Sequence, residues 1–245
     1  MAYKTTDTTS FNLDLNGLVE EAFERCGAEL RSGYDMRTAR RSLNLLTMEW
    51  ANRGINMWTI EQGSIPLVYT TPTPTITYDL PVNTVDLLDH VIRTGTGTNQ
   101  TDINISRISV STYASIPNKN ATGRPIQVWI QRLSGATDST NATVPPNINV
   151  WPSPDNSQTY TFVYWRLRRM QDAGNGINGQ DIPFRFMPCM VAGLAYYLSL
   201  KIPGAEGRIQ MLKAEYQEQF EMAATEDREK ASDRFVPRQM FIGGG

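Results

Sequence analysis

The 245-residue chain contains one histidine and two cysteines, and these shortages exclude several kinds of site. With His90 as its one histidine, the chain cannot form a metal site built from several histidines, and a catalytic triad could use only His90. Cys26 and Cys189 cannot form a disulfide framework, and both fall on apolar helical stripes. We therefore expect buried thiols, no metal site and no cofactor.

The sequence also has no large excess of charge of one sign and no long apolar run. Its 23 Lys and Arg against 25 Asp and Glu give a net charge of −2, which disfavours a DNA-coating protein. No apolar run reaches the roughly 18 residues of a membrane helix. The first residues show no secretory signal pattern. We expect no membrane insertion.

Helical periodicity is found near both ends of the chain. Apolar residues at spacings of three and four predict helices over 14–30, 36–53, 181–198 and 205–231. Asp35 and Asp181 are the expected caps of the second and third helices, with Pro183 in the first turn of the third. Gly54 stands where a left-handed residue ends a helix.

The middle of the chain, residues 55–170, is rich in Thr, Ser and Asn and holds short β-like runs between turn clusters. This composition favours antiparallel sheets with one solvated face. Residues 110–116 could form a helical turn instead. The predicted strands are Met57–Ile60, Ile65–Tyr69, Ile76–Leu80, Val85–Ile92, Ile103–Ile108, Ile126–Arg132, Ile148–Trp151 and Tyr160–Arg168.

This order of elements predicts an α+β fold. We expect the N- and C-terminal helix pairs to bury their apolar faces against each other as a helical bundle. An antiparallel β domain, a sandwich or a barrel, would be inserted between them. The predicted parts are a flexible arm (1–12), the bundle (13–54 plus 181–231), the β domain (55–180) and an extended C-terminal arm (232–245).

One glycine motif resembles a nucleotide-binding loop. Gly174, Gly176 and Gly179 fit the spacing G-x-G-x-x-G between a strand and a helix. However, the next helix begins several residues too late, and Pro183 removes an N–H from its first turn. The following segment is a helix pair and not another parallel strand. We interpret these residues as loop glycines.

Two clusters of arginine have two interpretations each. Arg37, Arg40 and Arg41 begin the second helix, and the first helix carries acids that include Glu20 and Glu24. The second cluster contains Arg166, Arg168 and Arg169. Either cluster could form solvated ion pairs within the chain, or it could contact carboxylates across a subunit interface.

Two other functions stay open on the residues alone. A cell-wall hydrolase would need paired acids, for which Glu49 or the first-helix acids Glu20, Glu21, Glu24 and Glu29 are candidates. A carbohydrate- or receptor-binding β module would need Trp129, Trp151 and Trp165 in one exposed groove. A solvated helix face and buried tryptophans are the simpler explanations.

Three sequence blocks, in order, resemble the head-to-tail adaptors of short-tailed bacteriophages, the family of tail tubular protein A and its tail-accessory relatives. The blocks are residues 43–58 (LNLLTMEWANRGINMW), 113–119 with 122–125 (YASIPNK and TGRP), and 150–155 (VWPSPD). The positions that carry the resemblance are Trp50, Arg53, Gly54, Trp58, Pro117, Lys119, Gly123, Arg124, Pro125, Trp151, Pro152 and Pro154.

The resemblance implies a structural virion protein of the tail or neck, assembled in the host cytoplasm, and not an enzyme. Its relatives form a dodecameric ring between the portal protein and the tail nozzle, where tail fibres can also attach. Genomic DNA passes through the ring without specific binding. For this chain the resemblance implies a subunit interface, for which we name Arg37, Arg40, Arg41, Glu20 and Glu24.

The C-terminal arm is apolar but too short to form a core of its own. The resemblance implies that such a segment becomes ordered on the portal. The expected portal-binding residues are Arg234, Phe235, Val236, Pro237, Arg238, Met240, Phe241 and Ile242. The two arginines would meet acidic portal groups.

Overall fold

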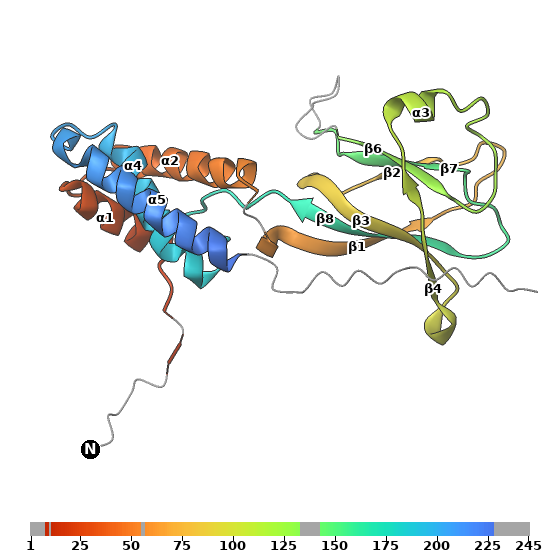
Figure 1. Cartoon of the computed structure of the whole chain (residues 1–245), viewed down its shortest axis with the longest axis horizontal. Coiled ribbons are helices and arrows are strands. Elements are labelled where there is room, and N and C mark those ends of the chain that lie inside the picture. Colours follow the sequence, from red (N-terminus) through yellow and green to blue (C-terminus); the bar gives the residue numbers. More distant parts are fainter. Residues whose placement is uncertain (1–7, 10, 55–56, 133–142, 228–245) are drawn as a thin grey trace, which may run out of the picture.

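The computed structural model describes residues 8–9, 11–54, 57–132 and 143–227. Its architecture is α+β, as predicted, with four long helices at one end and two sheets at the other (Figure 1). None of the described helices combines the length and the apolar character that crossing a membrane requires. The helices are α1 (Leu15–Cys26), α2 (Gly33–Asn52), α3 (Val110–Ala114), α4 (Met187–Ser199) and α5 (Ile209–Glu226).

The ends of the first two helices follow local chemistry. Asp14 caps α1 by accepting a hydrogen bond from the Gly17 N–H at 2.8 Å, and Gly27, with φ of 76°, ends the helix. The cap of α2 is Ser32 and not Asp35, which corrects our prediction. Asp35 is instead the third helical residue of a capping box and accepts a hydrogen bond from the Ser32 N–H.

The predicted cap of the third helix is also wrong. Asp181 makes no capping hydrogen bond, because a 3-10 turn (Phe184–Phe186) intervenes and α4 begins only at Met187. The predicted strand over 57–60 is likewise mostly a 3-10 turn, Met57–Thr59. The helical turn considered for 110–116 is present as α3.

Within the described residues, eight strands form two four-stranded sheets. The first sheet has the order β1-β8-β3-β4, and the second has the order β2-β7-β6-β5. All pairs are antiparallel except β5 with β6. The strands are β1 (Ile60–Leu67), β2 (Thr77–Asp79), β3 (Thr84–Thr94), β4 (Thr101–Asn104), β5 (Ser106–Arg107), β6 (Gln127–Gln131), β7 (Asn147–Trp151) and β8 (Tyr160–Arg168).

The buried apolar side chains form two clusters, one among the helices and one contributed by the strands. The helical cluster draws on α1, α2, α4 and α5, so segments from both ends of the described chain contribute to it. Gly193 of α4 lets these helices approach closely, because a Cβ there would lie 2.9 Å from the side chains of Leu46 and Tyr216. In the second cluster, Phe162 of one sheet and Ile148 of the other are fully buried.

Candidate functional site

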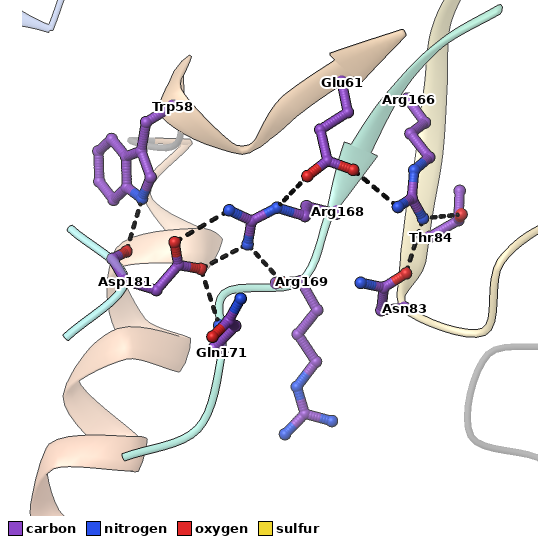
Figure 2. A network of polar contacts seen from close by, with 9 residues as sticks. All are labelled: Trp58, Glu61, Asn83, Thr84, Arg166, Arg168, Arg169, Gln171 and Asp181. Carbon is purple, nitrogen blue, oxygen red and sulfur yellow. Dashed lines mark hydrogen bonds and ion pairs between the residues drawn. The ribbon is translucent and has the colours of Figure 1, made fainter. Parts of the chain in front are cut away.

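A network of ion pairs and hydrogen bonds lies where the first sheet meets the helices (Figure 2). Arg166 and Arg168, near the end of β8, share one face of the strand and both bind the Glu61 carboxylate of β1 at 2.7 Å. Arg168 also forms a two-pronged ion pair with Asp181, which lies in the segment leading to α4. The network therefore ties two adjacent strands to the start of the C-terminal helices.

Three charged side chains of this network are mostly buried, whereas that of Glu61 is 42% exposed. The side chains of Arg166 and Arg168 are each 11% exposed, and that of Asp181 is 16% exposed. Burial by itself would raise the pKa of the Asp181 carboxyl, but hydrogen bonds from Arg168 and the Gln171 N–H lower it below its usual value. The hydrogen bond to Asp181 in turn raises the pKa of Arg168. Both groups stay charged and paired at neutral pH.

Aromatic side chains continue the connection into the helices. The Trp58 indole N–H donates to the backbone carbonyl of Asp181 at 2.8 Å, and its ring centroid lies 4.7 Å from that of Phe186. The ring centroid of Trp50 of α2 also lies 5.6 Å from that of Phe186, and the Trp50 indole N–H donates to the Tyr216 hydroxyl of α5 at 3.0 Å. We call the residues Glu61, Arg166, Arg168, Asp181, Trp58 and Phe186 the joint.

Glu49, the acid considered for hydrolysis, is part of a hydrogen-bond network among the helices. It accepts hydrogen bonds from Tyr197 at 2.6 Å and Tyr216 at 3.3 Å and forms an ion pair with Arg53. The Arg53 guanidinium also lies 4.4 Å from the Phe220 ring centroid. Burial is the main cause that raises the pKa of the Tyr197 and Tyr216 hydroxyls, so both keep the protons that they donate.

A second carboxylate is missing beside Glu49. A glycosidase needs two carboxyl groups about 5–10 Å apart across a substrate cleft. The hollow next to Glu49 contains no other Asp or Glu among the described residues. Its other lining residues are Arg53, Tyr196, Tyr197, Leu200, Lys213, Tyr216 and Gln217. The geometry therefore suits a structural network better than a pair of catalytic acids.

The remaining nucleophile and metal candidates lie on three different elements. Burial raises the pKa of the Cys26 thiol to about 11 and that of Cys189 to about 12, so neither is an active nucleophile at neutral pH. Both cysteines are buried, as predicted. His90 on β3 is buried against Phe162, and neither ring nitrogen has a hydrogen-bond partner in the described structure. Within that part of the chain, no group of His, Cys, Asp and Glu could hold a metal ion.

The loop that contains the glycine motif is hydrogen-bonded to the first turn of α1. The carbonyls of Asn178 and Gly176 accept hydrogen bonds from the N–H groups of Leu15 and Asn16 at 3.1 and 3.0 Å. A Cβ on Gly176 would lie 2.5 Å from the Asn16 side chain, so glycine permits this close approach. A phosphate-binding loop of this kind would present its ligand to the N-terminus of the helix that follows it, but α4 begins only at Met187. The interpretation as loop glycines is consistent with this arrangement.

The second and third blocks of the resemblance pack together on the outer face of the second sheet. Trp129 stacks on Tyr113 of α3 at 5.0 Å, and the ammonium of Lys119, two residues after Pro117, lies 5.5 Å from the same Tyr113 ring. The Trp151 indole donates to the Asn118 carbonyl at 3.0 Å. Trp165 belongs to the other sheet, so the three tryptophans do not form the common groove that a carbohydrate-binding module would need.

The turn before Arg124 and Pro125 is bound to the segment between Pro152 and Pro154. The Gly123 N–H donates to the Ser153 carbonyl at 2.8 Å, and the Ser153 N–H donates to the Ala121 carbonyl at the same distance. Both segments thus belong to one backbone-bonded unit, which follows the end of the inner strand β7. Their roles in the structure are local and structural.

The residues predicted for a subunit interface lie on exposed or partly exposed helix surfaces. Arg37, Arg40 and Arg41 make no ion pair with any described residue, although Arg40 donates to the Ala173 carbonyl at 3.3 Å. Glu20 and Glu24 are exposed on α1. Burial and the nearby charge of Arg41 lower the pKa of Lys201, as expected at a positive surface. The expected portal-binding residues 234–242 lie outside the described residues.

Comparison with known proteins adds no family assignment. No protein-family model matches the chain, and no curated protein matches it either.

The joint was not predicted as a site, because its partners are far apart in the sequence. The one available signal was the pair of arginines two residues apart, Arg166 and Arg168, in a region with few charges.

Proposed function

We propose that this protein is a structural adaptor in the neck of a short-tailed phage, where a ring of copies couples the portal to the tail nozzle and lets DNA pass. The proposal rests on the resemblance of three sequence blocks and on the way the described residues are connected. Such an adaptor must contact one partner at each end and keep the two contact regions in a fixed relation.

The joint is the observation that carries the proposal. It connects a helical part and a sheet part, each with its own buried cluster, and its central ion pair between Arg168 and Asp181 is mostly buried. Buried ion pairs of this kind hold one geometry, since separating them leaves an uncompensated charge. Residues of the 43–58 block, Trp50 and Trp58, pack at the same place.

In this proposal the N- and C-terminal helix pairs act as a bundle, and the β domain is an insert with a separate role. The bundle presents side faces to neighbouring copies, and rotationally repeated heterologous contacts close a ring. The β domain contacts the nozzle or the fibres, and the C-terminal arm attaches to the portal. A net charge of −2 avoids holding DNA phosphates, so the genome can slide.

Mass photometry of the purified chain, with and without the portal protein of the same virus, tests this function. We expect a species of ring size when the portal is added. A chain that stays monomeric with the portal would overturn the proposal. A variant lacking residues 234–245 should keep its unfolding transition and lose portal attachment, and unchanged attachment would refute the role of the arm.

A zymogram separates the adaptor from a hydrolase. The adaptor proposal expects no clearing of cell-wall substrate by the full chain. Clearing that disappears in Glu49→Gln, while the helical fold is retained, would favour the hydrolase instead.

A further inference from the structure

One face of α2 is exposed, basic and apolar at once. Tyr34, Arg37, Arg41, Leu45 and Met48 recur every three or four residues, the spacing that places side chains on a single helix face. Tyr34, Leu45 and Met48 are 64%, 53% and 43% exposed. Neither arginine has an ion-pair partner among the described residues. We call these five residues the basic face.

One face of α5 has the same apolar character and the opposite charge. Met211, Glu215, Glu218 and Met222 recur at helical spacing, and the two methionines are 59% and 50% exposed. Glu221 and Glu226 are exposed beside them. Glu215 already binds Arg25 of α1 at 2.5 Å, and Glu218 makes no ion pair with a described residue. We call Met211, Glu215, Glu218 and Met222 the acidic face.

These two faces are distinct from every other long-helix surface. Within the described residues, no large apolar side chain is exposed on α1 or α4, whereas α2 and α5 together carry five. The buried residues of α2 and α5 enter the helical cluster, and the two faces lie on the opposite sides of those helices. In one chain they therefore cannot cover each other.

We propose that the basic face of one copy docks on the acidic face of the next copy. This inference rests on the proposed function and names the surface by which the ring closes. Opposite charge and matching exposed Leu and Met side chains make the two faces complementary. Because the faces differ, each copy uses both, and the contact repeats head to tail as a ring requires.

The same observations favour a second copy over other occupants. A nucleic acid would match the arginines of the basic face but would leave the acidic face uncovered and repelled by phosphate. The acids of α1, Glu20 and Glu24, could also attract the arginines, but α1 offers no exposed apolar side chain to Leu45 and Met48. The acidic partner is therefore α5.

Cysteine cross-linking between separately prepared chains tests the contact. Met48→Cys chains and Met222→Cys chains are mixed at high concentration and oxidised. We expect a disulfide-linked dimer from the mixture and little from either variant alone, because a heterologous contact brings position 48 of one chain to position 222 of another. Cys26 and Cys189 are at most 3% exposed and do not compete.

Two comparisons make the result specific. Mixing Met48→Cys with Glu20→Cys chains tests α1 as the alternative acidic surface, and equal yield there would overturn the assignment to α5. A dimer formed equally well by Met48→Cys alone would show a symmetric contact and would also overturn it. Placing R37E/R41E in the Met48→Cys chains should lower the yield about tenfold, and placing E218R/E221R in the Met222→Cys partner chains should restore it.

The outcome for the ring itself is read separately. If mass photometry shows ring formation with the portal but positions 48 and 222 do not cross-link, this surface is wrong and the adaptor function stands. If the two positions cross-link but no ring forms with the portal, the surface is supported as a self-contact and the proposed function fails.

Discussion

Two arginine clusters of this chain occupy opposite environments. Arg166 and Arg168 are almost buried and contact carboxylates in two other segments of the same chain. Arg37 and Arg41 lie on an outward face of α2 and have no ion pair with a described residue. The sequence shows the same residue type in both places. The difference indicates that Arg166 and Arg168 fix the shape of one molecule, while Arg37 and Arg41 are available to another molecule.

His90 adds a third combination to this comparison, since it is buried but has no hydrogen-bond partner in the described structure. A buried ion pair such as that of Arg168 stabilises one geometry, and an exposed charge without an ion pair, such as Arg37, has little effect on folding. A buried imidazole without a hydrogen-bond partner, such as that of His90, is costly to protonate. Each combination leads to a different measurable response.

Replacing Arg168 should have the largest effect. Arg168→Met leaves the nearly buried Asp181 carboxylate without its counter-ion and should lower the free energy of unfolding by about 3 kcal/mol. Arg169→Met is the matched control, because the exposed pair of Arg169 with Asp172 contributes less than about 0.5 kcal/mol. Urea denaturation measures both. Equal losses in the two variants would mean that the joint is no more important than a surface ion pair.

The joint should also affect the stability of the fold at acidic pH. Burial alone would raise the pKa of the Asp181 and Glu61 carboxyls, but hydrogen bonds from the arginines lower both pKa values below their ordinary values. The ionised pairs therefore stabilise the fold fully above the ordinary carboxyl pKa of about 4, and this stability is lost as pH falls through the lowered pKa values. Denaturation midpoints across this range should fall less steeply in Arg168→Met. An unchanged slope would contradict the prediction.

His90 should give a smaller response at higher pH. Burial, with help from the charge of Arg107, lowers the pKa of His90, and Asp89 opposes the shift. The neutral ring is therefore favoured in the fold, and stability is lost as pH falls below the ordinary histidine value of about 6.5. His90→Phe keeps a ring beside Phe162 and should flatten this part of the profile. A profile that is identical to that of the unchanged chain would exclude His90 as its source.

The smallest effect on stability is expected at the basic face. Arg37→Ala with Arg41→Ala removes exposed groups without an ion-pair partner among the described residues and should change the free energy of unfolding by less than about 0.5 kcal/mol. The same variant should weaken self-association. Thermal unfolding and sedimentation of one sample measure both quantities. A loss of stability as large as that of Arg168→Met would remove the distinction between the two clusters.

The local elements were largely predictable from the sequence. The first helix ends at Cys26 and not near residue 30 as predicted, but the apolar stripe within it is buried, because helical spacing reports directly on one face. Its buried members are Leu15, Leu18, Val19, Ala22, Phe23 and Cys26. Strand β8 appears over the predicted residues 160–168. These features depend on neighbours within a few positions, which a single sequence displays.

The joint could not be predicted in the same way. Asp181 followed by Pro183 is typical of a helix start, but a 3-10 turn delays α4 and frees the carboxylate for Arg168. Trp58 and the Asp181 carbonyl are 123 residues apart, and nothing local sets which strand lies beside which. Contacts of this kind depend on the register of whole sheets.

The hydrogen bonds from Leu15 and Asn16 to the carbonyls of residues 178 and 176 have a mechanical consequence. The stretch between β8 and α4 is fastened at two points, at Asp181 by the arginine of β8 and at residues 174–179 by the start of α1. A force applied to the sheets therefore reaches the helices through contacts with α1 as well as through the backbone that leads into α4. A linker held at two points resists rotation of the sheets relative to the helices more than a linker held at one point would.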